Sequence, residues 1–179
     1  MKSVTRILLA VFALAICAAA TETKSDYDHS YNLSALQSFK FADQSQRAAN
    51  DALGGNDLNE RRIRSAIQQN LTTLGMNENS GDPSFIIAFY AGTQKQAQIS
   101  TTGYGPLRRS IGQVWVNQSF EGTAIVDFID AKTNQVVWRG FVSRTVDPNK
   151  SEENIRKAIK KLIERFAKDR QQQKERVSK

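Results

Sequence analysis

The stretch "GTAIVDFIDAKTNQVVWRG", residues 122–140, constrains the fold more than any other part of this sequence. Two apolar runs surround the polar segment Ala131–Asn134. That segment suits a four-residue hairpin loop whose last residue is left-handed, because asparagine tolerates this conformation. Pairing Asp130 with Gln135 then sets the register, and Ile129 falls opposite Val136. The stretch therefore predicts two antiparallel strands in a sheet.

Trp138 and Arg139 close this hairpin and allow two interpretations. In the predicted register Trp138 lies opposite Asp127, so it fills the core and donates its ring N–H to an acceptor such as Asp127. Arg139 is then an edge residue that keeps its charged end in solvent. Alternatively, Trp138 and Arg139 form a contact surface, because these residue types are frequent hot spots of interfaces.

Apolar residues at helical spacing predict two helices. The first begins at Asn56 or Asp57 and ends at Gly75, which supplies a left-handed stop. The second begins at Ser151 and carries one apolar stripe. From Lys168 onward apolar residues become rare, so we expect the helix to fray into a solvated tail.

The other apolar segments predict strands. Two short strands are expected within residues 26–42, and further strands at 84–92, 94–101 and 113–121. Residues 43–56 and the glycine-bearing "TTGYGPLRRSIG" predict loops. The expected fold is α+β: a twisted, mainly antiparallel sheet of about six strands with two helices packed on one face. We expect a single domain over residues 21–170 and a polar basic tail over 171–179.

Residues 1–20 have the layout of a signal peptide. Lys2 and Arg6 precede an apolar run over residues 7–16, and Ala18, Ala19 and Ala20 follow it. Ten apolar residues fall short of the roughly 20 that a membrane-spanning helix needs. We therefore expect an exported, periplasmic protein whose mature chain has no transmembrane helix.

Two routes of maturation stay open. Cleavage before Thr21 releases a soluble chain without cysteine. In the other route Cys17 is the site of lipid attachment, because "LAIC" is similar to a lipoprotein box, and the acylated chain is anchored to a membrane. Ile16 departs from that box, which favours a small residue there. An intrachain disulfide is excluded, since Cys17 has no partner.

The positive charge lies mostly at the C-terminal end. Loss of Lys2 and Arg6 lowers the formal net charge from +7 to +5, and residues 150–179 alone carry eleven Lys or Arg against five Asp or Glu. This basic helix can face an anionic membrane surface, or it can dock on the sheet with a solvated charged face. Arg108 and Arg109 form a smaller basic patch with the same two interpretations. Nucleic acid is not an expected partner of an exported chain.

No set of residues predicts catalysis. His29 is the single histidine of the sequence, and strand alternation places it opposite Asp26 and Asp28. Without Cys17 the chain cannot build a zinc site from His and Cys ligands, and it has no standard nucleophile–base pair unless His29 serves as the base. The glycines match no phosphate-binding loop. We expect no catalytic residue, no metal and no cofactor, and therefore no enzyme.

The order of the segments resembles a known family. The segments "DYDHSYNLSALQSFKFA", "LNERRIRSAIQQNLTTLGM", "PSFIIAFYAG" and "EGTAIVDFIDAKTNQVVWRGFVSRTV" are similar to the bacterial envelope lipoprotein family catalogued as domain of unknown function 4136. The resemblance covers residues 26 to about 167. It implies a periplasmic or outer-membrane-attached α+β domain without an established enzymatic activity. Its segment "GYGPLRRSI" departs from the more aromatic loop of the family.

Two functions are consistent with these observations. The first is a non-catalytic exported cell-envelope protein that acts through contacts with an envelope protein or another envelope component. The alternative is a carrier or binder of a small apolar or anionic ligand, held in a cleft between sheet and helices or at the loop of Arg108 and Arg109.

Overall fold

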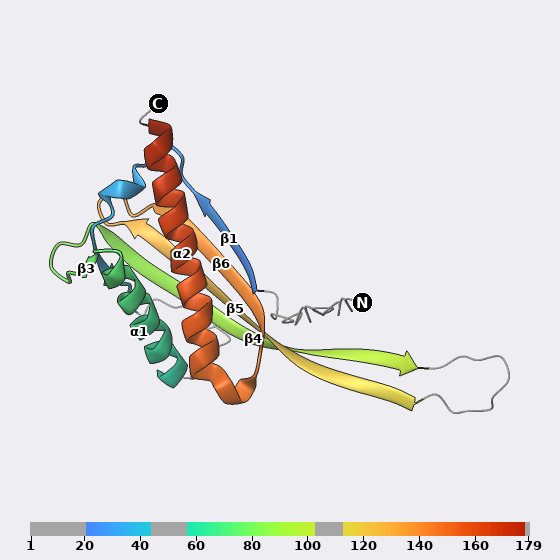
Figure 1. The fold of residues 1–179 in the computed structure, drawn as a ribbon. Helices are drawn as coiled ribbons and strands as arrows, with labels where there is room; N and C mark the ends of the chain where they lie inside the picture. The colour runs from blue at the N-terminus through green and yellow to red at the C-terminus, as the bar shows by residue number, and fades with distance from the viewer. Residues whose placement is uncertain (1–20, 44–56, 103–112, 178–179) are drawn as a thin grey trace, which may run out of the picture.

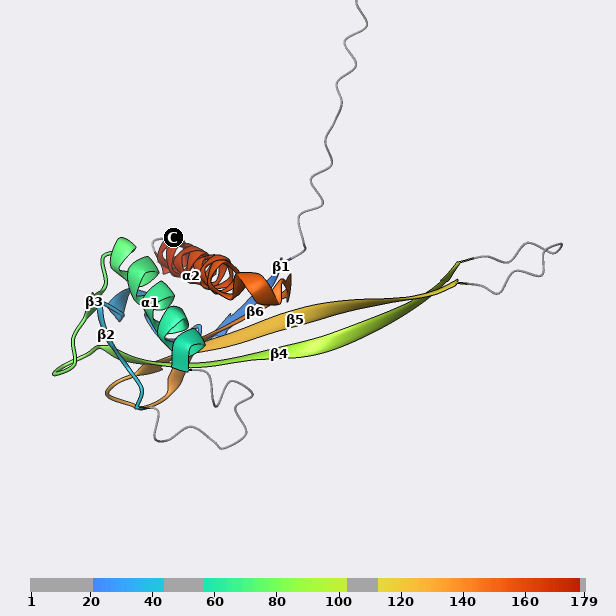
Figure 2. The same cartoon turned by 90° about the horizontal axis from the view of Figure 1, so that it is seen from below.

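Six strands form one sheet in the part of the chain that the structure describes, and two helices cover one face of it (Figures 1 and 2). The structure is a computed structural model that describes residues 21–43, 57–102 and 113–177. The strands are β1 (Thr21–Tyr27), β2 (Ser38–Phe41), β3 (Asn77–Glu78), β4 (Phe85–Thr102), β5 (Gln113–Asp130) and β6 (Val136–Val146). The helices are α1 (Asp57–Thr73) and α2 (Ser151–Val177), with single 3-10 turns η1 (Leu33–Ala35) and η3 (Pro148–Lys150).

The sheet is mixed, with the strand order β1-β6-β5-β4-β2-β3. The pairs β1–β6, β6–β5 and β5–β4 are antiparallel, whereas β2 runs parallel to both β4 and β3. The parallel pairing arises because α1 lies between β2 and β4 in the chain and returns it to the same end of the sheet. The predicted α+β fold is confirmed, with parallel pairs at one edge.

Alternate residues of the strands create the face that the helices cover. Phe85, Ile87 and Phe89 of β4 are buried there, and Phe128 lies opposite Ile87 on β5. The rings of Phe128 and Phe166, on α2, meet edge to face at 4.8 Å between centroids. Aromatic pairs of this kind add to the apolar burial that holds helix and sheet together. The buried residues of the two helices include Ile63, Ile67, Leu71, Ile159, Leu162, Ile163 and Phe166.

The hairpin between β5 and β6 confirms one part of the prediction and corrects another. Asn134 has a φ of 56° and Ile129 pairs with Val136, as the sequence predicts. A β-bulge then follows, because Phe128 pairs with Trp138 and Val137 is an extra residue. The predicted register is therefore wrong by one residue from Trp138 onward.

Each of the two longest strands is continuous where the sequence predicted two segments. β4 and β5 have 18 residues each and pair along their whole length. Their distal parts, residues 96–102 and 113–118, extend beyond the helices as a two-stranded ribbon, which we call the arm (Figures 1 and 2). Neither Gly92 nor Gly122 interrupts its strand, since they pair with Thr123 and Thr93.

The helix α2 is longer than predicted. It continues to Val177 instead of fraying after Lys168. Gln173 is buried, and its side chain accepts a hydrogen bond from Leu33 N (2.8 Å) and donates one to Tyr31 O (2.6 Å). This polar contact holds the last turns of α2 on the segment around η1. Within the described ranges, neither helix has the length and apolar character needed to cross a membrane.

The remaining predictions have mixed outcomes. α1 begins at Asp57, and Gly75 follows its end with a φ of 82°, as expected. The first strand is β1, which ends at Tyr27, so Tyr31 lies in a turn and not in a strand. The signal peptide of residues 1–20, Cys17, most of the predicted loop over 43–56, and Arg108 with Arg109 all lie outside the described residues.

Candidate functional site: a cleft between sheet and helices

A cleft of about 360 Å³ opens between the helices and the middle of the sheet. Ligand sites in proteins usually have volumes of about 300–1,000 Å³, so this space is large enough for a small molecule. The lining residues come from α1, α2, the three longest strands and the position just before η3: Asn59, Ile63, Ala91, Gly92, Thr93, Lys95, Phe120, Gly122, Thr123, Ala124, Arg144, Val146, Asp147, Ser151, Asn154, Ile155, Ala158 and Ile159.

The cleft exists because the side chains of the sheet become smaller along its helix-facing side. Where β4 begins and β5 ends, this face of the sheet carries large aromatic side chains such as Phe85 and Phe128. Further along, Ala91 pairs with Ala124, and Thr93 pairs with Gly122. These small residues cannot fill the space beneath the helices. A side chain at Gly122 would also meet Val146, whose Cγ1 lies 2.8 Å from an added Cβ.

The upper wall of the cleft is apolar. Ile155, Ala158 and Ile159 of α2 line it at helical spacing, and Ile63 of α1 adjoins them. Ile63 and Ile159 belong to the buried core, with 2% and 1% of their surface exposed. The same apolar stripe that docks α2 on the sheet therefore also forms one side of the cleft.

Arg144 is the polar feature that distinguishes this cleft. Strand alternation in β6 places Arg144 on the same side as Trp138 and Val142, which face the helices. Its Nε is buried and has no hydrogen-bond partner among the described residues. Leaving a buried donor unpaired costs free energy. Arg144 is also one of the residues that line the cleft, so its guanidinium group can attract an acceptor there.

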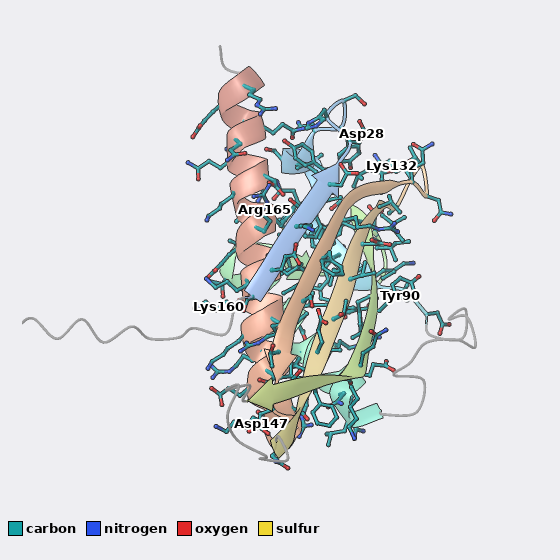
Figure 3. All side chains as sticks on the ribbon, turned by 90° about the vertical axis from the view of Figure 1, so that its right-hand side faces the viewer. Asp28, Tyr90, Lys132, Asp147, Lys160 and Arg165 are labelled. Atoms are coloured by element: carbon teal, nitrogen blue, oxygen red, sulfur yellow. The ribbon has the colours of Figure 1, made fainter. Side chains whose placement is uncertain are left out.

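The other charged groups at the cleft are Lys95 and Asp147. Lys95 is exposed. Asp147 caps η3, because its Oδ1 accepts the N–H of Asn149 at 2.9 Å, and its carbonyl oxygen accepts Nδ2 of Asn154 at 2.7 Å. Figure 3 shows Asp147 near the end of the sheet where α2 begins. The acidic group is thus committed to the local turn.

Trp138 does not form the predicted contact surface, because none of its surface is exposed. Its ring packs on those of Phe128 and Phe166, at 4.8 and 5.3 Å between centroids. Its Nε1 donates to Asp169 Oδ2 at 3.0 Å, and not to Asp127. The acceptor lies on the part of α2 where the sequence predicted a solvated tail. The interpretation of Trp138 as a core residue is correct, and its expected partner is wrong.

Arg139 lies on the opposite face of the sheet from the cleft and is exposed. Its Nε and Nη2 each donate to a carboxylate oxygen of Asp127 at 2.6 Å. This hydrogen-bonded ion pair raises the pKa of Arg139. Tyr90, 43% exposed, lies on the same face, away from α2 (Figure 3). A role of Arg139 in contacts with a partner stays a prediction.

His29 lies apart from the cleft and is exposed. Its ring meets that of Tyr27 at 4.5 Å between centroids, and the neighbouring Asp28 accepts hydrogen bonds from Ser30. Those bonds lower the pKa of Asp28. Within the described parts of the chain, no three His, Cys, Asp or Glu residues gather in a way that could hold a metal ion.

The basic side of α2 is partly neutralised by its own acidic residues. Lys157 pairs with Glu153 at 2.5 Å, and this ion pair lowers the pKa of Glu153. Lys161 pairs with Glu164 at 3.4 Å. Arg165 reaches Asp169 at 3.1 Å and also donates to Ser25 Oγ. The apolar stripe docks on the sheet as expected, and contact of the charged side with an anionic membrane surface stays a prediction.

The sequence did not reveal Arg144 as a candidate residue. The available signal is weak: an arginine two residues after a core valine, on the core parity of a strand. The small residues opposite it, Gly122 and Ala124, belong to the hairpin stretch and indicate its strand but not a cleft.

One protein-family model matches most of the chain. A family model described as "Domain of unknown function (DUF4136)" matches residues 23–166. The chain belongs to this family. The DUF4136 match covers every residue that lines the cleft and confirms the resemblance found from the sequence. A search of curated proteins finds no match for the sequence.

Three solved structures are similar to the chain at low sequence identity. A PDZ domain protein from Parabacteroides distasonis ATCC 8503 matches with a TM-score of 0.52 and 15% identity, over 80% of this chain and 34% of that protein. A PelC dodecamer from Paraburkholderia phytofirmans matches with a TM-score of 0.49 and 9% identity, over 82% and 97%. A minor lipoprotein from Acinetobacter baumannii matches with a TM-score of 0.36 and 12% identity, over 78% and 93%. The first likeness concerns the fold alone, and the other two carry no argument about function.

Proposed function

We propose that this DUF4136 protein is a non-catalytic, exported protein of the cell envelope that binds a small apolar or anionic molecule in its sheet–helix cleft. The observation that carries the proposal is Arg144, which lines an otherwise mainly apolar cleft and whose Nε has no hydrogen-bond partner in the described parts of the chain. Export is supported by the signal-peptide layout of residues 1–20. Of the two functions considered from the sequence, the cleft favours the ligand binder.

A binding role accounts for the groups present at the cleft. Acid–base catalysis needs a group that accepts or donates a proton at the substrate. The carboxylate that lines the cleft, Asp147, instead caps a turn. Arg144 and Lys95 can attract the negative charge of a ligand. These residues support recognition of a ligand.

Native mass spectrometry of the mature protein purified from its own host tests this proposal. We expect a bound small molecule in wild type and its loss in Ala158→Met, which places a longer side chain in the cleft. Ala167→Met, a change on the same helix outside the cleft lining, is the matched control and should retain the ligand. An empty wild-type protein that also takes up no apolar or anionic probe would contradict the proposal.

A second candidate function is contact with an envelope protein or another envelope component, and the arm favours it. Residues 96–102 and 113–118 extend beyond the body of the protein (Figure 1). Crosslinking in intact cells should recover a specific partner with the full chain and lose it when the arm is shortened. Recovery of the same partner by the full and the shortened chain would show that the arm is not needed for this contact.

Localisation rests on how the N-terminus matures. An intact mass that corresponds to a start at Thr21 indicates a soluble periplasmic protein. A mass that includes an acylated Cys17 indicates a membrane anchor. Incorporation of labelled fatty acid into wild type but not into Cys17→Ser would establish the anchor independently.

A further inference from the structure

We propose that the ligand of the cleft is a single-chain amphiphile with a carboxylate head group, that is, a fatty acid. Its head group binds Arg144, and its chain lies along the apolar wall formed by Ile63, Ile155 and Ile159. This inference rests on the proposed ligand-binding function and names the chemical class of the ligand.

The anionic end of the ligand follows from the arginine. A guanidinium group forms strong, often bidentate hydrogen bonds with a carboxylate. The same geometry occurs in this protein where Arg139 holds Asp127 through two bonds of 2.6 Å. Arg144 lines the cleft, and among the described residues its Nε has no acceptor, so a carboxylate in the cleft would give this guanidinium group a partner of the kind that Asp127 gives Arg139.

The apolar end follows from the walls. Ile155 and Ala158 border the cleft on α2, opposite Ala91 and Ala124 on the sheet. These surfaces offer no charge to a polar ligand body, and a hydrocarbon chain gains free energy by leaving water for such surroundings. Against these apolar residues a polar ligand body would lose hydrogen bonds to water, which only the polar residues elsewhere in the lining, such as Thr93 and Asn154, could replace.

The size of the cleft limits the ligand to one chain. At about 360 Å³ it lies near the lower end of the usual range for ligand sites. The small floor residues Ala91 and Gly122 give it depth beneath the helices, where the neighbouring rows of the sheet are filled by Phe85 and Phe89. A two-chain phospholipid would exceed this space.

Calorimetric titration of the mature, ligand-stripped protein with dodecanoate tests the assignment. Dodecanol, with the same chain and no charge, should bind at least tenfold more weakly. Shortening the fatty acid should weaken binding about fourfold for each methylene removed, the fold-change that corresponds to about 0.8 kcal/mol. Lysophosphatidic acid with a dodecanoyl chain tests a lipid phosphate as the alternative head group.

Variants locate the head group. Arg144→Met keeps the length of the side chain without its charge and should weaken dodecanoate at least tenfold while leaving dodecanol unchanged. Arg144→Lys should bind dodecanoate more tightly than Arg144→Met. Arg156→Met removes an exposed arginine of α2 outside the cleft lining and is the control. Circular dichroism spectra should confirm that all variants fold.

Three results would overturn the inference. Equal affinity for dodecanol and dodecanoate would show that the carboxylate contributes nothing to binding, although a ligand could still bind in the cleft. Tighter binding of lysophosphatidic acid than of dodecanoate would replace the carboxylate by a phosphate. Dodecanoate binding that Arg144→Met and Ala158→Met both leave unchanged would place the ligand elsewhere and would contradict the proposed function as well.

Discussion

At position 140 the lack of a side chain allows the indole of Trp138 to lie close to its own strand. A Cβ at Gly140 would lie 2.3 Å from Cη2 of Trp138 and 2.9 Å from Cδ1 of Leu162. Both neighbours are fully buried, so neither has free space to move into. In the short sequence "WRG", Gly140 therefore provides the space that the buried ring of Trp138 occupies.

Gly140→Ala should lower the free energy of unfolding by about 1–3 kcal/mol, the usual cost of overpacking a core. Gly81→Ala is the control, because the nearest atom to its added Cβ, Asn79 Oδ1, is 3.7 Å away. Urea unfolding measures both. Equal stability of Gly140→Ala and wild type would show that Trp138 can repack at no cost.

Tyr31 and Asp130 give the protein two pH-dependent contributions to stability. Tyr31 Oη donates to Asp130 Oδ2 at 2.7 Å, and Thr133 N donates to Oδ1 at 2.7 Å. The hydrogen bond from Tyr31 is the main cause that lowers the pKa of Asp130. Burial, followed by the hydrogen bond and the charge of Asp130, raises the pKa of Tyr31.

The signs differ for the two groups. Because the folded pKa of Asp130 is depressed, its contribution is present above the unfolded value near 4 and is lost as the pH falls through the folded pKa. Because the folded pKa of Tyr31 is raised, its contribution is present below the unfolded value near 10 and decreases as the pH rises above it.

Tyr31→Phe should lower stability by about 1–2 kcal/mol at neutral pH, since it removes a hydrogen bond to a partly buried carboxylate. Its stability should also fall less steeply than that of wild type above about pH 10. Denaturant unfolding across the pH range tests both statements. Tyr90→Phe, at an exposed tyrosine, should behave as wild type. Parallel curves for wild type and Tyr31→Phe would contradict this account.

At the scale of elements, polar side chains in the last turns of α2 hold the segment around η1 by hydrogen bonds. Gln173 bonds both Leu33 N and Tyr31 O, and Arg170 Nη2 lies 3.4 Å from Ser34 O. Leu33 is fully buried, so its N–H depends on this glutamine for a partner.

Gln173→Ala should destabilise the protein by about 1–3 kcal/mol, because it leaves a buried backbone N–H without an acceptor. Gln172→Ala, one residue earlier on the exposed side of α2, should be nearly neutral. Thermal unfolding followed by circular dichroism separates the two variants. A solvated tail, as the sequence predicted, would make them equivalent.

The sequence predicts elements best where a local pattern decides them. Both helices start where predicted because capping residues precede apolar residues at helical spacing. Asn134 is left-handed as expected because its turn type demands it. The bulge could not be predicted: in "VVW" three consecutive apolar residues fit either parity, and tertiary packing buries both Val137 and Trp138. The end of α2 was not predicted, because its last turns are held by the polar contacts of Gln173 and their sequence lacks apolar residues at helical spacing.

The site was less predictable than the fold. The sequence allowed a cleft between sheet and helices but named no residue in it. Arg144 is a candidate because Gly122 lies opposite it and because none of the residues that the structure describes offers an acceptor to its Nε. An empty space beneath α2 depends on the sizes of residues on separate strands, and no single stretch of sequence contains that information.

At the scale of the whole molecule, the arm and the body are separable. Replacing residues 97–118 by Asn-Gly joins Gln96 to its partner Ser119 through a two-residue hairpin. The shortened chain should keep its melting temperature within a few degrees, because the core residues lie in the body. It should also keep dodecanoate binding. A large fall in melting temperature would show that the arm contributes to the stability of the body.

The first strand and the last helix of the described chain both pack on the part of the sheet that contains β6. β1, the first strand, pairs along its whole length with β6, and α2, the last helix, supplies Phe166 to the ring cluster above them. A chain that ends before β6 therefore leaves β1 without its partner strand, and one that ends before Phe166 lacks a ring of the core. During synthesis, β1 can therefore gain its partner strand only after residues 136–146 have been added.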